Sequence, residues 1–238
     1  MLHITHAKAG STWIVGILQT LFGRRVVPRQ YGMPDFKKNR GKVLSVFLSR
    51  DDFMMRPELA GSQRFIVLRD LRDTLVSRYF STRNSHPLDP AGKIQAARAE
   101  LCALPIEEGL SRLMEHEGMM RTARIQQSWL HSGEIVLWYE DLIADDVGQF
   151  EKLFNERLKL KLSAKFIRHA VELNRFEAIY RRKPGEEDVH SHGRKGVAGD
   201  WRNYFTPELE AQFQDRFGSL LTATEASAGR MCESSVAR

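Results

Sequence analysis

Four short apolar runs, separated by longer segments of helical periodicity, set the expected fold. They lie at residues 2–6, 42–48, 65–68 and 135–139. Runs such as KVLSVFL and FIVL are apolar and rich in β-branched residues, as strands buried on both faces are. Short strands that alternate with helices predict an α/β fold in three layers, a central parallel sheet flanked by helices.

Helical patterns fill most of the chain between and after these runs. We expect helices from about Thr12 to Phe22, from Asp70 to about Thr82, within 91–132, and at about 146–158 and 163–172. Their apolar residues recur at the spacing that places them on one face of a helix. The order of elements therefore agrees with a single α/β unit.

The C-terminal third carries a polar segment and a last helix. Residues 183–200 are polar and contain glycines, and we expect a loop there. The helix should begin after Thr206 as N-cap, with Pro207 at its first position. Residues 222–238 are small and polar and are expected to form a disordered tail, which leaves 1–221 as one domain.

Composition narrows the class of protein. Of 238 residues, 42% are hydrophobic and 28% charged, as in ordinary globular proteins. No run of about 18 apolar residues is present, the N-terminus lacks the apolar core of a signal peptide, and the two cysteines are far apart. We therefore expect a cytoplasmic protein without disulfides. A net charge of +6 favours anionic ligands without choosing among nucleotide, nucleic acid and membrane.

A glycine-containing loop joins the first strand to the first helix. Gly10 lets the backbone approach a ligand, while Ser11 and Thr12 add hydroxyls to the N–H groups of the helix N-terminus. Lys8 can supply a point charge to a phosphate. The loop is therefore a candidate anion site, although an ordinary capped turn has the same residues. The form G-x-x-x-x-G-K-[ST] is absent from the sequence, which argues against an ATP-dependent kinase.

Two further segments contain candidate phosphate ligands. Arg69 follows the third strand and Ser77 lies eight residues on, in the next helix. Ligands of open α/β sheets bind at the carboxyl ends of strands, and a guanidinium there can hold a phosphate through two hydrogen bonds. Alternatively, Arg69 pairs with Asp70 or Asp73. The later run RKGVAGDW at 194–201 places two cations and two glycines in a loop, which suits either an anionic ligand or solvent.

Taken in order, these segments resemble the PAPS-dependent sulfotransferases, where PAPS is 3′-phosphoadenosine 5′-phosphosulfate. KAGSTW resembles the family's K-S-G-T-T-W loop, the Arg69–Ser77 pair its R-x₇-S pair, and RKGVAGDW its R-K-G-x-x-G-D-W segment. YEDL at 139–142 ends the fourth strand, where the family has a tyrosine near the adenine. The likeness spans residues 2 to about 217 and implies a P-loop-like fold and sulfuryl transfer from PAPS.

The resemblance also implies residue roles. The 5′-phosphosulfate would be held by Lys8, Ala9, Gly10, Ser11 and Thr12. The 3′-phosphate would be held by Arg69, Ser77, Arg194, Lys195 and Gly196. Trp13, Tyr139 and Phe176 would lie near the adenine, although Trp13 and Phe176 could equally be core residues. His192 stands where relatives often have an aromatic residue.

The general base is the point of departure from the family. Relatives often place a histidine after the second strand, but here the stretch reads SVFLSRDDF. Asp51 or Asp52 could take the acceptor's proton, and two acids before an apolar run also favour a helix start. His86 and His116 are rivals, and the acids are the preferred candidates.

The remaining expectations concern partners. The acceptor should be a small molecule with a hydroxyl or amine, and PAP, 3′,5′-adenosine bisphosphate, should be released without any metal. A P-loop kinase that uses a nucleoside triphosphate is the alternative enzyme. A polyanion binder is a third possibility, but the cations cluster in loops among many acids, so neither nucleic acid nor membrane is expected as a partner. The sequence leaves the oligomeric state open.

Overall fold

A four-stranded parallel sheet forms the centre of the protein in its computed structural model, which describes residues 1–28, 32–218 and 220. The strands are β1 (Leu2–Thr5), β2 (Leu44–Phe47), β3 (Arg64–Leu68) and β4 (Val136–Trp138). Their order in the sheet is β2-β1-β3-β4, and every pairing is parallel. The predicted parallel α/β sheet is confirmed.

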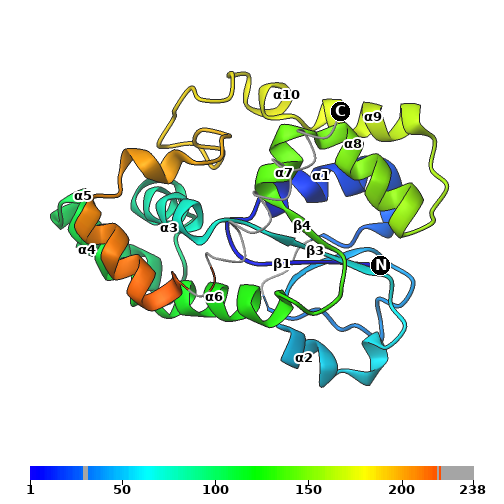
Figure 1. Cartoon of the computed structure of the whole chain (residues 1–238), viewed down its shortest axis with the longest axis horizontal. Coiled ribbons are helices and arrows are strands. Elements are labelled where there is room, and N and C mark those ends of the chain that lie inside the picture. Colours follow the sequence, from blue (N-terminus) through cyan, green and yellow to red (C-terminus); the bar gives the residue numbers. More distant parts are fainter. Residues whose placement is uncertain (29–31, 219, 221–238) are drawn as a thin grey trace, which may run out of the picture.

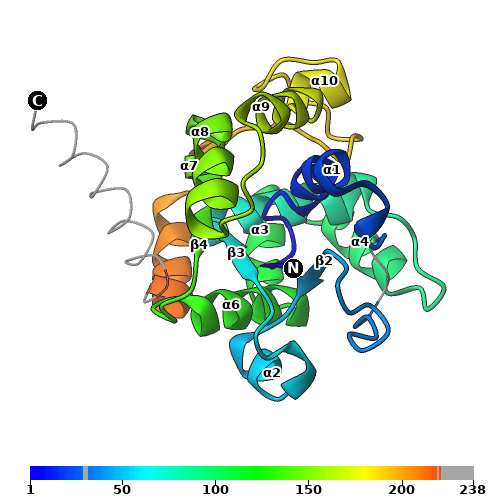
Figure 2. The same cartoon turned by 90° about the vertical axis from the view of Figure 1, so that its right-hand side faces the viewer.

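Helices cover both faces of the sheet and one of its ends (Figure 1). On one face lie α1 (Ser11–Phe22), α7 (Tyr139–Ala144), α8 (Asp146–Glu151), α9 (Ala164–Leu173) and α10 (Phe176–Tyr180). On the other face lie α2 (Arg50–Met54) and α6 (Glu117–Trp129). Beyond the ends of the strands lie α3 (Leu71–Phe80), α4 (Lys93–Ala103), α5 (Ile106–Met114) and a helix over 207–218. Figure 2 shows α2 and α9 on opposite sides of the sheet.

Each layer has its own apolar core. Ile14, Ile17 and Leu18 of α1 are fully buried and pack with Phe65 and Phe154 on one side of the sheet. These α1 positions share one face of the helix, so the apolar residues whose spacing predicted the helix are the ones that it buries. A second cluster on the other side and a third around α3 complete the packing.

The strand order places a topological switch point between β1 and β3. After β1 the chain forms β2, which pairs with one edge of β1. It later returns to form β3, which pairs with the other edge of β1. In open α/β sheets the connections diverge at such a point and leave a crevice beyond the carboxyl ends of the two strands. The segment after Thr5 and the segment after Leu68 meet at this crevice.

Most element boundaries agree with the sequence-based expectations, with local differences. The predicted strand 135–139 ends at Trp138, and Tyr139 is instead the first residue of α7. The helix expected to reach Thr82 leaves α-helical geometry after Phe80 and continues as a π-helical turn, Ser81–Ser85. The backbone N–H of Leu209 donates to Thr206 Oγ at 3.2 Å, which confirms the predicted N-cap.

Two further expectations concern the ends of the chain and the membrane. The tail predicted at 222–238 lies outside the described residues. Among the residues that the structure describes, no helix combines the length and the apolar character needed to span a bilayer.

Asp73, in the first turn of α3, joins the polar segment 183–200 to the body of the protein. Its carboxylate accepts hydrogen bonds from the backbone N–H of Gly199 (2.6 Å) and of Trp201 (2.9 Å). Asp73 itself is only 2% exposed, so its carboxylate depends on these two amides and on other protein groups for partners. Asp73 thus fixes residues 194–201, called the basic glycine loop below, beside the carboxyl ends of the strands.

Replacing Asp73 by alanine should lower the free energy of unfolding by about 3 kcal/mol, because two partly buried amides lose their acceptor and the buried guanidinium of Arg69 loses its ion-pair partner. Urea denaturation followed by circular dichroism measures the loss. Asp215→Ala is the control, since Asp215 is exposed on the helix over 207–218 and should change stability by less than about 0.5 kcal/mol. Equal effects of the two substitutions would contradict the anchoring role.

Candidate active site

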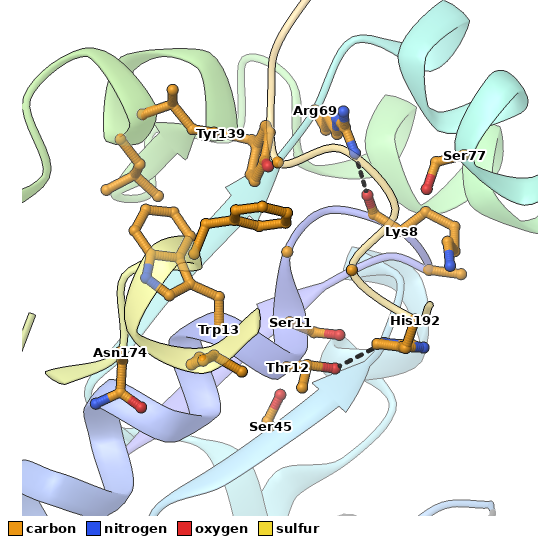
Figure 3. Close-up of a pocket in the computed structure, with 18 of the residues that line it drawn as sticks. Lys8, Ser11, Thr12, Trp13, Ser45, Arg69, Ser77, Tyr139, Asn174 and His192 are labelled. Carbon is orange, nitrogen blue, oxygen red and sulfur yellow. Dashed lines mark hydrogen bonds between the residues drawn. The ribbon is translucent and has the colours of Figure 1, made fainter. Parts of the chain in front are cut away.

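A cavity of about 1520 Å³ opens at the carboxyl ends of the strands. It is lined by the loop after β1, the residues after β3 and β4, segment 174–180 and segment 192–198. Figure 3 draws 18 of its lining residues and labels ten, with Trp13 and Asn174 on one side and Lys8 and Ser77 on the other. The three segments predicted from the sequence as possible phosphate sites, and the two predicted to lie near the adenine, therefore meet in one cavity.

The loop between β1 and α1 has the geometry of an anion site. Lys8 and Gly10 have positive φ angles of 70° and 76°, and Gly10 is the N-cap of α1. A Cβ added to Gly10 would lie 2.8 Å from the Tyr139 ring, so only glycine fits there. Glycine has no side chain to accept the first N–H groups of α1, which are therefore available to an anion.

Arg69 ties two loops together at the floor of the cavity. Its guanidinium donates to the carbonyl oxygen of Lys8 at 3.0 Å and to that of Val197 at 3.1 Å, as Figure 3 shows for Lys8. It also lies 3.6 Å from Asp73 Oδ2 and 4.3 Å over the Tyr139 ring. The ion pair with Asp73, which the sequence offered as the alternative to a phosphate contact, is thus present. Arg69 Nε has no hydrogen-bond partner among the described residues and can still donate to a ligand.

The basic glycine loop balances its own charge. Asp200 accepts from Lys195 Nζ at 2.6 Å and from Arg194, and Arg194 also pairs with Glu187. Burial alone would raise the pKa of Asp200, but the hydrogen bonds from Lys195 and Arg194 outweigh it and hold that pKa below its usual range. Asp200 therefore keeps its charge and fixes both cations at the cavity wall.

Aromatic side chains line the part of the cavity next to α1 and α10. Trp13 and Tyr139 meet edge to face with ring centroids 6.1 Å apart. Phe176 lies against Gly196, which has a φ of 66°, and a Cβ on that glycine would overlap the Phe176 ring. These three aromatic side chains give this part of the cavity wall apolar surfaces against which a planar ring can pack.

Sequence analysis missed two titratable residues next to the strand ends. His6 follows β1 and is fully buried, with Nε2 accepting from the Arg69 N–H at 3.2 Å; burial lowers its pKa to about 4. Glu140 follows β4 and accepts from the Asp70 N–H at 3.1 Å, while its other oxygen is buried without a described partner. Burial raises the pKa of Glu140 to about 7. Only their positions directly after strands could have signalled these residues.

The structure separates the candidates for the general base. His86 lines the cavity, and burial together with the nearby charge of Lys8 lowers its pKa below the ordinary value. Asp51 and Asp52 do not line the cavity: Asp52 exchanges hydrogen bonds with Ser49 at the start of α2. His116 caps α6 by accepting the Gly118 N–H at 3.1 Å. The two acids thus lie in the first turn of α2, the helix-start role that was the alternative to a catalytic base, because β2 leads directly into this helix.

His192 also lines the cavity and contacts the loop of residues 6–12 between β1 and α1, called the phosphate loop below. Its Nε2 lies 3.2 Å from the hydroxyl of Thr12, an interaction drawn in Figure 3. Every residue proposed above as a cofactor ligand lines this cavity except Ala9, which is fully buried beneath the loop. The cavity thus brings together the residues that the sequence could place only in separate segments.

Comparison with known proteins identifies the family. A profile of the sulfotransferase domain matches residues 64–225, more than half of the chain. The chain belongs to the sulfotransferase family. A search of curated proteins found no match to this sequence. The predicted membership of the PAPS-dependent sulfotransferases is confirmed, and the alternative of a kinase gains no support.

Solved structures share the fold of this sulfotransferase at low sequence identity. The mouse sulfotransferase SULT7A1, complexed with PAP, is 17% identical with a TM-score of 0.66, over 96% of this chain and 88% of that one. Retinol dehydratase with androsterone and PAP is 16% identical (TM-score 0.53), and with retinol and PAP 17% identical (TM-score 0.56). Each of these two matches covers 92% of this chain and 80% of the other. The predicted P-loop-like fold is confirmed.

Glu140→Gln should change how stability depends on pH. Folded Glu140 keeps its proton up to about pH 7, whereas the unfolded chain releases it near 4.5, so this residue makes the wild type lose stability as pH rises between these values. Glutamine cannot titrate, so the variant should gain up to about 3 kcal/mol on the wild type across that window. Urea titrations from pH 4 to pH 8 measure the difference.

His6→Gln serves as the matched comparison, because the pKa of His6 is lowered by folding whereas that of Glu140 is raised. Folded His6 resists protonation down to about pH 4, whereas the unfolded chain takes up the proton near 6.5, so the wild type loses stability as pH falls through this window. The variant should therefore gain on the wild type towards acid pH. A difference for either variant that stays constant with pH would refute the shift assigned to that residue.

Proposed function

We propose that this sulfotransferase transfers the sulfuryl group of PAPS to a hydroxyl or amine of a small molecule and releases PAP. The observation that carries the proposal is the single cavity in which the phosphate loop, Arg69 and Ser77, the basic glycine loop and three aromatic side chains meet. Complexes of relatives with PAP support this choice of donor.

The donor would bind along the cavity. The phosphosulfate end would lie at Lys8 and the first N–H groups of α1, with the hydroxyls of Ser11 and Thr12 beside it. The 3′-phosphate would lie between the Arg69–Ser77 side and the loop of Arg194, Lys195 and Gly196. The adenine would fit between Trp13, Tyr139 and Phe176, whose rings face the same part of the cavity.

The chemistry follows from where the charges lie. The acceptor oxygen or nitrogen attacks the sulfur in line, and the bond from sulfur to the bridging oxygen of the phosphate breaks. Lys8 would stabilise the negative charge that develops on the leaving oxygen. His86 would take the acceptor's proton, since it lines the cavity and its lowered pKa keeps the imidazole neutral.

Three further parts of the proposal concern cofactors, partners and location. No metal is required in the proposed reaction, because Lys8 and helix N–H groups supply the positive charge. A small acceptor is favoured over nucleic acid or membrane, because Arg194 and Lys195 are paired with acids rather than exposed as a basic face. We place the enzyme in the cytoplasm, where the free, exposed thiol of Cys102 would stay reduced.

The 3′-phosphate assignment can be tested with two serines of the same cavity. Ser77→Ala should weaken PAP binding about tenfold and leave 5′-AMP binding unchanged, because only PAP carries the 3′-phosphate. Isothermal titration calorimetry with both nucleotides measures this. Ser45→Ala is the control, since Ser45 lines the opposite part of the cavity on β2. Equal binding of PAP and AMP by the wild type would refute the donor site.

The base assignment can be tested by comparing the candidates directly. His86→Asn should lower kcat by about 10² to 10⁴ with PAP affinity unchanged. Asp51→Asn and Asp52→Asn should retain the wild-type kcat, because these acids lie outside the cavity. Transfer of radiolabelled sulfate from PAPS to a phenol or alcohol gives the rates. A loss confined to the aspartate variants would restore them as the candidates.

A further inference from the structure

The cavity has a second, largely apolar half beside β2. This half is lined by Val27, Pro28, Met33, Pro34, Val46 and Phe47. It adjoins Lys8 and His86, the residues proposed to act at the leaving oxygen and at the acceptor. The donor is proposed to occupy the part of the cavity with the aromatic side chains and the phosphate ligands. The apolar half is therefore where the acceptor would bind, an assignment that rests on the proposed function.

One cation of the cavity, Arg121, comes from a helix on the face of the sheet opposite α1. Arg121 belongs to α6, whose first turns lie near the ends of the strands in Figure 1. Gly118, one turn before Arg121, accepts from Arg78 of α3 at 3.0 Å, and Gln126, further along, contacts His6 at the end of β1. α6 is thereby fixed with Arg121 at the wall of the cavity.

The electrostatic setting of Arg121 differs from that of the other arginines in the cavity. Arg69 lies near Asp73, Arg175 pairs with Asp146, and Arg194 pairs with Asp200. No residue in the described part of the chain forms a hydrogen bond or an ion pair with Arg121.

The acidic side chains of the cavity lie away from Arg121. Glu140, Asp146 and Glu177 come from α7, α8 and α10, on the nucleotide side. Glu117 lies one turn before Arg121 on α6 but forms no ion pair with it among the described residues, so the guanidinium can offer its positive charge and five N–H donors to a ligand.

We infer that Arg121 selects acceptors that combine an apolar body with an anionic group, such as hydroxylated carboxylic acids. The apolar wall would hold the body, the hydroxyl would face His86 and Lys8, and the carboxylate would form two parallel hydrogen bonds with the guanidinium. Arg121 is exposed, so the strength of this contact depends on its geometry of two hydrogen bonds rather than on exclusion of water. Arg121 is thus a specificity-determining residue of the acceptor site.

The test compares each acid with its neutral amide. Binding of 3-(4-hydroxyphenyl)propionate, 12-hydroxydodecanoate and the two corresponding amides is measured by calorimetry on protein saturated with PAP. The wild type should bind at least one acid about tenfold more tightly than its amide. Arg121→Gln should reduce that ratio to about one, and Arg121→Lys should keep part of it. Arg124→Gln should keep the full ratio, because Arg124 is exposed on the same helix outside the cavity.

The outcomes separate this inference from the proposed function. Equal binding of acid and amide by the wild type, no binding of either, or a preference that survives Arg121→Gln would each overturn the selection by Arg121. PAP affinity is measured on the same samples and should be equal in wild type and Arg121→Gln. Failure of the wild type to bind PAP would instead overturn the donor site itself.

Discussion

The buried guanidinium of Arg69 is the interaction on which the rest of the site depends. It is at the end of β3 and donates to the backbone of the phosphate loop and to that of the basic glycine loop. These loops are more than a hundred residues apart, and each has a glycine that an added Cβ would push into an aromatic ring. Burying a charge is costly unless it is paired, and Asp73 one turn along α3 provides the pair.

The same turn of α3 therefore positions both loops of the proposed donor site. Asp73 accepts from two amides of the glycine loop while it balances Arg69, so the loop and the guanidinium are positioned by one carboxylate. His6 adds a further constraint, because its ring accepts the N–H of Arg69 and is held neutral by burial. Each of these links joins a side chain to a backbone group or to another side chain, so the positions of the two loops depend on Arg69, Asp73 and His6 being held together.

Sequence patterns predicted the fold and the segments of the site well, and for physical reasons. Strands buried on both faces must be apolar throughout, and the loop at Gly10 needs a residue without a Cβ, so both leave a local trace. Glu140, His6 and Arg121 leave none, because a single polar residue after a strand or on a helix has the pattern of a solvated side chain. Only the tertiary structure shows that His6 is buried, that Glu140 has a buried carboxylate oxygen and that Arg121, although exposed, lines the cavity. Asp51 and Asp52 show the same limit, since acids near a strand end suit a catalytic base and a helix start equally, and only the position of α2 places them at a helix start outside the cavity.

The position of His86 couples the two charge movements of the proposed reaction. The π-helical turn after α3 carries His86 to the rim of the cavity, where Arg98 donates to its carbonyl oxygen at 2.6 Å. Lys8 lowers the pKa of His86 and would also stabilise the leaving oxygen. Protonation of His86 beside Lys8 is unfavourable while the lysine charge is uncompensated, but it becomes easier as negative charge develops on the departing PAP. Proton removal from the acceptor would therefore be favoured only as the bond from sulfur to the leaving oxygen breaks, which disfavours a free, premature nucleophile in the cavity.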